Sequence, residues 1–240
     1  MGKMGCGYGS EFHLLRYLGY HRNDLSRAIE KETSGRIIDW RDFRFDARGK
    51  FPYLDAELKG LEFLGREAVG VEPAWAEFWP QSGNPPNWDA VGLLQLASHT
   101  EFLLVEAKAH TSEVNSDCGA DEKGGLGIIR KAFARTIEAH GFNSDPEKWL
   151  KPYYQYANRL ATLHFLLRHD VLSRLVFIYF TGDDPTLYRK PVVCPKSEQE
   201  WDSHLQKMYD HLGMPGSSEL KRRVHRVFLP ICGRTGGSPQ

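Results

Sequence analysis

The stretch NWDAVGLLQLASHTEFLLVEAKAH, residues 87–110, decides the fold because it contains two apolar runs separated by a short polar segment. Apolar runs of this length, bounded by turn residues, are typical of β-strands, so we interpret the stretch as a β-hairpin. The second run is apolar on both faces, which indicates a strand in the interior of a sheet. Charged residues are uncommon in such strands, yet Asp89 lies in the first run and Glu106 and Lys108 lie in the second.

The three charged side chains are expected to converge. Side chains alternate along a strand, so Glu106 and Lys108 lie on the same face. If Ser98 and His99 form a two-residue turn, Asp89 faces Lys108 and lies diagonally across from Glu106, at a separation of roughly 7 Å. The alternative is an ion pair at a solvated edge, worth about 0–1 kcal/mol. The central position of the strand favours a functional site.

The segments around the hairpin predict a mixed succession of helices and strands. Before it, residues 10–20 have helical spacing, residues 36–71 are interpreted as loops and short elements, and AWAEFWP at 74–80 is interpreted as the first strand of a three-stranded meander. After it, the apolar periodicity predicts helices over 126–140 and 149–167, a buried strand in RLVFIYFTGD, a helix in SEQEWDSHLQKMYDHLG and a final strand in RRVHRVFLPIC.

The composition is that of an ordinary globular protein. Of the 240 residues, 41% are hydrophobic, 26% are charged and 12% are aromatic, and we expect a single domain over residues 1–240. We find no apolar run near the roughly 18 residues of a membrane span and no signal-peptide segment, so we expect a cytoplasmic protein that does not act at a membrane. The four cysteines form no CxxC pair, which gives no indication of a zinc ribbon or a disulfide scaffold.

The charge balance restricts how the chain could bind nucleic acid. Lysine plus arginine equals aspartate plus glutamate, 31 against 31, so the net charge offers no argument for a nucleic-acid partner. A binding surface would have to be local. The stretch KRRVHR at 221–226 and the side chains of Arg130, Lys131 and Arg135 are candidates, although a charge run of this length is also typical of a solvated strand or loop.

Two carboxylates and one ammonium group on a hairpin are suited to phosphate chemistry. Mg²⁺ is held by one or two protein carboxylates together with waters and substrate phosphate oxygens. An ammonium group cannot ligate the metal, but it can position a water molecule and offset the charge that grows on a phosphate in the transition state. Asp89, Glu106 and Lys108 therefore point to metal-assisted hydrolysis of a phosphodiester, with Mg²⁺ as the expected cofactor and Mn²⁺ as a substitute.

The pattern of Asp89 followed by Glu106-Ala107-Lys108 across a hairpin resembles the PD-(D/E)xK nuclease superfamily. The resemblance implies an α/β fold with a restriction-endonuclease-like αβββαβ core, in which helices flank a central mixed sheet. The match covers about residues 8–20 and 74–182, with an insertion at about 21–73 and a C-terminal extension at 183–240. One departure is that Trp88 precedes Asp89 where many relatives have proline.

The resemblance also implies roles for individual residues. Asp89 and Glu106 would hold the metal, and Lys108 would position the attacking water. A glutamate of the first helix often completes such sites, and Glu11 is the candidate here, although a glutamate in a first helical turn can instead be favoured by the helix dipole. Gln155, in YYQYANR, resembles a helix glutamine that some of these nucleases place near the metal, but it could equally be a surface residue.

The leading functional hypothesis is a Mg²⁺-dependent nuclease acting on nucleic acid, with DNA as the expected substrate. His110 and Arg130 are candidate substrate contacts, His110 because it follows Lys108 by two residues and could reach a phosphate. The first alternative is a nuclease-like fold without catalysis that binds nucleic acid or a protein partner. A second is a metal-dependent hydrolase of a small phosphorylated molecule. The sequence leaves open the oligomeric state, a homodimer included.

Overall fold

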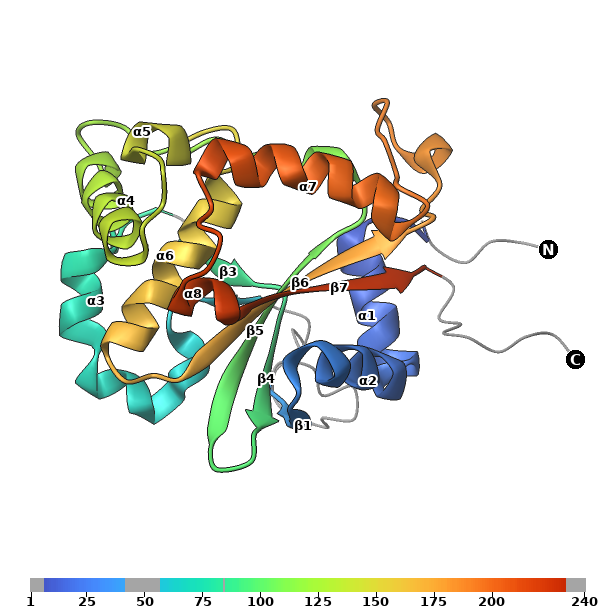
Figure 1. Cartoon of the computed structure of the whole chain (residues 1–240), viewed down its shortest axis with the longest axis horizontal. Helices are drawn as coiled ribbons and strands as arrows, with labels where there is room; N and C mark the ends of the chain where they lie inside the picture. The colour runs from blue at the N-terminus through green and yellow to red at the C-terminus, as the bar shows by residue number, and fades with distance from the viewer. Residues whose placement is uncertain (1–6, 42–56, 84, 232–240) are drawn as a thin grey trace, which may run out of the picture.

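The computed structural model describes residues 7–41, 57–83 and 85–231, which form a mixed α/β structure (Figure 1). Within these ranges the central sheet has five strands in the order β1 (Arg36–Trp40), β4 (Ala90–Gln95), β5 (Thr100–Lys108), β6 (Ser173–Thr181) and β7 (Val224–Pro230). The β1–β4 and β4–β5 pairs are antiparallel, and the β5–β6 and β6–β7 pairs are parallel. The sheet is therefore mixed, and β5 lies at its centre as predicted.

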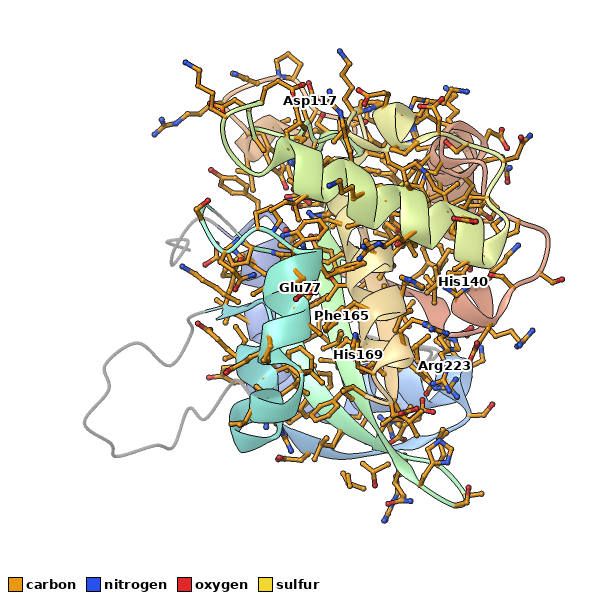
Figure 2. The ribbon with its side chains drawn as sticks, turned by 90° about the vertical axis from the view of Figure 1, so that its left-hand side faces the viewer. Glu77, Asp117, His140, Phe165, His169 and Arg223 are labelled. Carbon is orange, nitrogen blue, oxygen red and sulfur yellow. The ribbon has the colours of Figure 1, made fainter. Side chains whose placement is uncertain are left out.

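Helices cover both faces of the sheet, which explains the continuous apolar runs of β5 and β6. On one face Leu103 and Val105 of β5 pack with α1 (Ser10–Tyr20) and α2 (Arg22–Thr33). On the other face Phe102 and Leu104 pack with α3 (Glu72–Phe78), α4 (Leu126–His140), α6 (Tyr154–Arg168) and α7 (Glu198–Leu212). Figure 2 shows α3, α4 and α6 from their outer side, with Phe165 on α6 near α3. A strand buried on both faces needs apolar residues at consecutive positions.

The prediction of a strand at 74–80 is wrong, because this segment forms helix α3. Pro73 occupies its first turn, where its missing N–H removes no hydrogen bond. Trp75 and Phe78, three positions apart, are both buried. In a short segment that alternates alanine with aromatic residues, strand and helix periods cannot be told apart.

The antiparallel neighbour of β4 is instead β1, which comes from the segment that we interpreted as loops and short elements. It is an edge strand, and most of its side chains are exposed or half-buried, with Trp40 buried. An edge strand of this kind has little hydrophobic alternation to detect. With β1 in place, the strands β1, β4 and β5 form the three-stranded meander.

The helix predicted over 149–167 is two helices, α5 (Pro146–Trp149) and α6 (Tyr154–Arg168). Pro152 lies between them, and proline cannot donate the backbone hydrogen bond that a continuous helix would require there. The apolar stripe of α6 is nevertheless buried as predicted, with Leu160 and Leu163 fully inaccessible to solvent.

The other predicted elements are confirmed as α1, α4, β6, α7 and β7. Helix α7 shows a local cause for its bounds, because the Ser197 hydroxyl accepts the Glu200 N–H at its start and Gly213 adopts φ 66° at its end. The remaining elements are short: β2 (Leu58–Lys59), η1 (Glu62–Gly70), β3 (Asn87–Trp88), η2 (Thr111–Glu113), η3 (Pro185–Leu187) and α8 (Glu219–Arg222). Among the described helices, none has the length and apolar character that crossing a bilayer requires.

The predicted hairpin register is wrong by two residues. Ala90 pairs with Val105 and Gln95 with Thr100, whereas the predicted register would pair Ala90 with Ala107. Asp89 lies just before this paired stretch, and its backbone N–H donates to Val105 O at 3.0 Å rather than taking a place opposite Lys108. The turn has four residues, 96–99, and the side chain of Gln95 closes it by donating to the carbonyl oxygens of Leu96 and His99. A shift of two residues leaves every side chain on its predicted face, so the convergence of the three charges survives the correction.

Candidate active site

A cavity of about 260 Å³ brings together the residues of the predicted catalytic motif. The motif residues Asp89, Glu106 and Lys108 line it from the β4–β5 hairpin, and Glu11 from the first turn of α1 and Gln155 from α6 line it as well. The remaining lining residues are Ser10, Leu14, Leu15, Glu57, Asn87, Ala107 and Arg159. The sheet, α1 and α6 therefore converge on the hairpin charges.

Glu106 is a buried carboxylate held by two cations. It is only 4% exposed, and its Oε1 accepts a hydrogen bond from Lys108 Nζ at 2.5 Å. Its Oε2 accepts from Arg159 Nε at 3.0 Å and from Arg159 Nη2 at 2.8 Å. Burial alone would raise the pKa of Glu106, but the charges of Arg159 and Lys108 outweigh it and lower this pKa below its ordinary value. Glu106 is therefore ionised.

Asp89 has the opposite electrostatic balance. The residue immediately precedes β4, and its Oδ2 accepts the backbone N–H of Ala107 at 2.7 Å, which fixes the carboxylate against β5. Burial, and then the negative charge of Glu106, raise the pKa of Asp89 to about 7 against the opposing effect of Lys108. Asp89 is thus the carboxyl group of the pair that burial favours in its protonated form, whereas Glu106 stays ionised.

Lys108 lies between Glu106 and the helix that carries Gln155. Besides its contact with Glu106, its Nζ donates to Gln155 Oε1 at 3.2 Å. Burial would lower the pKa of Lys108, but the carboxylates of Glu106 and Asp89 outweigh it and raise this pKa above its ordinary value. Lys108 is consequently an ammonium cation at neutral pH. It can position a water molecule or stabilise negative charge, but in this state it is not a general base.

Arg159 is a site residue that the sequence reasoning missed. It follows Gln155 by four residues, so both side chains project from the same face of α6. The residue is 4% exposed, and its guanidinium lies 5.1 Å from the centre of the Trp88 ring. The sequence feature that could have indicated this role is a single arginine within an apolar helix pattern, one turn after Gln155. The stacking on Arg159 also accounts for the tryptophan that stands before Asp89.

The first-helix glutamate lines the cavity but is exposed. Glu11 lies in the first turn of α1, where its carboxylate faces both the cavity and the N-terminal end of the helix dipole. A further acid, Glu57, lines the same cavity and accepts a hydrogen bond from Asn87 Nδ2 at 2.7 Å. The role of Glu11 stays a prediction.

His110 and Arg130, the other predicted substrate contacts, do not line this cavity. The ring of His110 contacts Tyr188, with centroids 4.7 Å apart, and its Nε2 lies 3.4 Å from a carboxylate oxygen of Glu113. Arg130 is paired with two carboxylates, at 2.5 Å from Glu147 and 2.6 Å from Glu122. His110 comes after the end of β5, where the chain has already turned into η2. Arg130 lies on α4, and its charge is neutralised locally.

The ligand set was tested against the metal that the sequence predicts. Among the residues that the structure describes, no group of three or more His, Cys, Asp or Glu side chains is arranged to hold a metal ion. Two opposed carboxylates nevertheless suit Mg²⁺, which accepts one or two carboxylates and completes its shell with waters and phosphate oxygens. Lys108 would have to release Glu106 Oε1, while Arg159 could stay on Oε2. With that single exchange Asp89 and Glu106 fit a divalent cation.

No protein-family model, no curated protein and no solved structure matches this chain. Evidence for function therefore comes from the charges and contacts inside the cavity.

Proposed function

We propose that the protein is a Mg²⁺-dependent nuclease that hydrolyses phosphodiester bonds, with DNA as its expected substrate. The observation that carries this proposal is the cavity that brings Asp89, Glu106 and Lys108 together, with the Asp89 pKa raised to about 7. A divalent cation between the carboxylates would offset the charge of Glu106 and favour the ionised form of Asp89, which would reverse this rise. Strongly perturbed carboxylates in a cavity are typical of functional sites.

The order of elements supports the resemblance to the PD-(D/E)xK superfamily. Helix α1, the strands β1, β4 and β5, helix α6 and strand β6 occur along the chain in the αβββαβ order, with β1 replacing the strand expected at 74–80. Other elements are inserted into this order: α2 before β1, the segment with α3 before β4, and α4 and α5 before α6. The acidic and basic residues of the motif lie at the β4–β5 hairpin. Fold order and motif position together favour a nuclease over an unrelated ion-pair network.

Five residues of the cavity have roles in this proposal. Asp89 and Glu106 would hold Mg²⁺, which when bound supplies Lewis-acid polarisation of phosphate oxygens. Lys108 positions the attacking water and offsets charge on the phosphate in the transition state. Gln155 orients the Lys108 ammonium through its 3.2 Å hydrogen bond. Arg159 keeps Glu106 ionised when Lys108 turns toward the substrate.

The test combines metal binding with cleavage. Calorimetric titration with Mg²⁺ and Mn²⁺ should show binding to the native protein and a large loss in Asp89→Asn. Single-turnover assays on labelled DNA and RNA should show cleavage that requires the metal. Asp39→Asn, at an exposed position of edge strand β1, serves as a control for loss of a carboxylate. Absence of both divalent binding and cleavage would refute the nuclease.

One observation favours the alternative of a nuclease-like fold that only binds. Both oxygens of Glu106 are occupied by cations of the chain itself, Lys108 on Oε1 and Arg159 on Oε2. An ion network that is complete without a metal would hold the architecture together without catalysis. This alternative predicts nucleic-acid or protein binding that is insensitive to EDTA, together with no cleavage in Mg²⁺ or Mn²⁺.

A further inference from the structure

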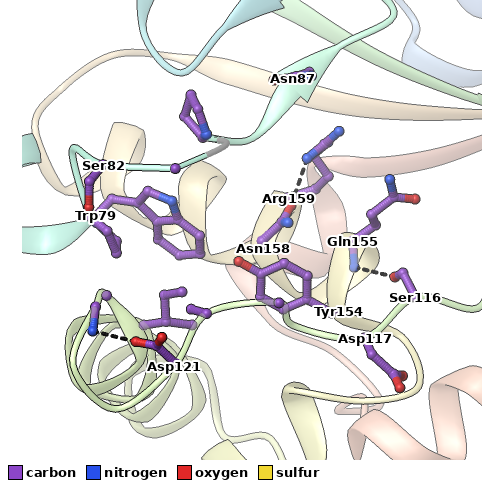
Figure 3. A pocket seen from close by; sticks show the side chains of 18 residues that line it. Trp79, Ser82, Asn87, Ser116, Asp117, Asp121, Tyr154, Gln155, Asn158 and Arg159 are labelled. Carbon is purple, nitrogen blue, oxygen red and sulfur yellow. Dashed lines mark hydrogen bonds between the residues drawn. The ribbon is translucent and has the colours of Figure 1, made fainter.

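A larger cavity of about 680 Å³ adjoins the candidate active site (Figure 3). Asn87, Gln155 and Arg159 line both cavities, so the two are separated only by shared side chains. The larger cavity lies between α6, the segment after α3 and the loop at 116–125 that leads into α4. Any group attached to a phosphate in the active site on this side would enter it.

The lining of this cavity is polar and carries acidic groups away from the active site. Asp117 and Asp121 line it from the loop, and Ser82, Tyr154 and Asn158 line it from other segments. Figure 3 shows the Tyr154 ring between the loop and α6, with Asn158 and Arg159 next to it. Asn158 is 5% exposed, and its Oδ1 accepts a hydrogen bond from Arg159 Nη1 at 2.7 Å. Arg159 thus lies where the two cavities meet, whereas Asp117 and Asp121 line the larger cavity and not the candidate active site.

The charges of the lining residues determine which chemical groups can bind in the larger cavity. A second phosphate would be repelled by Asp117 and Asp121, whereas an uncharged sugar and base would find hydrogen-bonding groups and the ring of Tyr154. Aromatic side chains commonly stack on bases in proteins that bind single strands. The volume also lies within the range of about 300–1,000 Å³ that is typical of sites for small ligands.

We propose that the larger cavity binds one unpaired nucleoside next to the scissile phosphate, so that the substrate is a single-stranded or locally unpaired polynucleotide. The inference rests on the proposed nuclease function. A base that is paired and stacked in a duplex cannot enter a cavity of this kind unless it leaves the stack. Arg159, at the junction, lies where the backbone between the two sites passes.

The variant Gly119→Phe tests the cavity by filling it. Gly119 lines the cavity, and a Cβ added there meets no atom within 4 Å, so a larger side chain has room to project. Gly127→Phe is the matched control, because Gly127 is exposed on α4, has the same 4 Å clearance and does not line the cavity. Ser82→Trp fills the cavity from the segment after α3 and provides an independent second variant.

Two measurements test the native protein and these variants. Fluorescence anisotropy with a labelled oligonucleotide in Ca²⁺ reports binding, and single-turnover cleavage in Mg²⁺ compares the same strand alone and in a full duplex. We expect the native protein to cleave the single strand faster than the duplex by about tenfold or more, because a base must leave the duplex stack before it can enter the cavity. A tenfold difference in rate corresponds to about 1.4 kcal/mol. Gly119→Phe and Ser82→Trp should weaken binding of the single strand by a factor similar to this difference in rate. Neither variant should change Mg²⁺ binding as measured by calorimetry. Gly127→Phe should behave as the native protein.

The outcomes separate this inference from the function on which it rests. Equal cleavage of duplex and single strand, unaffected by both cavity variants, would overturn the nucleoside site while leaving a metal-dependent nuclease. Hydrolysis of a dinucleotide but of no polynucleotide would also overturn it, in favour of a small substrate. If the native protein cleaves nothing in any divalent metal, the nuclease proposal fails and the nucleoside site fails with it.

Discussion

Replacing Asp89 with asparagine should stabilise the metal-free protein, even though it removes a residue of the proposed active site. The raised pKa of Asp89 means that the folded state holds its proton more tightly than the unfolded chain does. For a carboxyl group with a raised pKa, stability is lost as pH rises from the unfolded value toward the folded one. The loss therefore begins near pH 4 and is complete somewhat above pH 7.

The size of the effect follows from the pKa itself. A change of one in pKa corresponds to about 1.4 kcal/mol, so the rise from 3.8 to about 7 corresponds to about 4 kcal/mol once Asp89 is ionised. Asparagine removes the charge and keeps an oxygen that can accept the Ala107 N–H. Because Glu106 readjusts when its neighbour changes, we expect about 2–4 kcal/mol of added stability at pH 8.5 and much less at pH 4.5.

Mg²⁺ should act in the opposite direction. A ligand that binds only the folded state raises the free energy of unfolding by about 2.7 kcal/mol at a concentration of 100 Kd. Mg²⁺ should therefore reduce or invert the difference in unfolding free energy between the native protein and Asp89→Asn. The assay is urea unfolding at pH 4.5, 7 and 8.5 in EDTA and in Mg²⁺. Asp39→Asn, at an exposed position of edge strand β1, is the matched control.

Two results would refute this reasoning. The first is a destabilised Asp89→Asn protein at pH 8.5 in EDTA, which would mean that the hydrogen bond to Ala107 outweighs the charge. The second is equal stabilisation of both proteins by Mg²⁺, which would place any bound metal away from Asp89.

The remaining predictions concern the cations of the site and its surface. Lys108→Met should slow single-turnover cleavage by about 10²-fold or more while Mg²⁺ binding is retained, since the ammonium acts mainly in the transition state; unchanged cleavage by a folded variant would exclude the assigned role. Arg159→Met should lower the free energy of unfolding of the metal-free protein, because buried Glu106 then keeps only Lys108 as a partner. In denaturant titrations we expect a loss at the lower end of the range of about 3–5 kcal/mol that follows from breaking a buried ion pair. A loss below about 1 kcal/mol would contradict the buried pair of Arg159 and Glu106. DNA binding should weaken steeply as the salt concentration rises, and binding that does not depend on salt would contradict a phosphate-contacting surface. Arg130→Gln should change the Kd for DNA little, because Glu122 and Glu147 already pair with Arg130.

Parts of the candidate site could be predicted from the sequence because they depend on local periodicity. Asp89, Glu106 and Lys108 belong to one hairpin. Strand alternation places Glu106 and Lys108 on one face whatever the turn, and Asp89 shares that face as long as the register shifts by an even number of residues. The correction from a two-residue turn to a four-residue turn changed which residues are opposed but not which face they occupy. The central place of β5 was predictable for a similar reason, since burial on both faces leaves a continuous apolar run.

Other parts depend on contacts between distant segments, which local patterns do not encode. The edge strand β1 has mostly exposed or half-buried side chains, and the short segment of α3 fits two periods. Arg159 lies 53 residues from Glu106 along the chain. Its place one turn after Gln155 could have marked it as a site residue, but it does not identify the carboxylate that it meets.

What the sequence determined by itself is the identity and the face of the hairpin charges. Only the tertiary structure decided their electrostatic state. The packing of α6 over β5 brings Arg159 to Glu106, which lowers the pKa of Glu106. Burial and then the charge of Glu106 raise the pKa of Asp89. Ionisation depends on distance and burial in three dimensions, and these are set when the helix packs on the sheet.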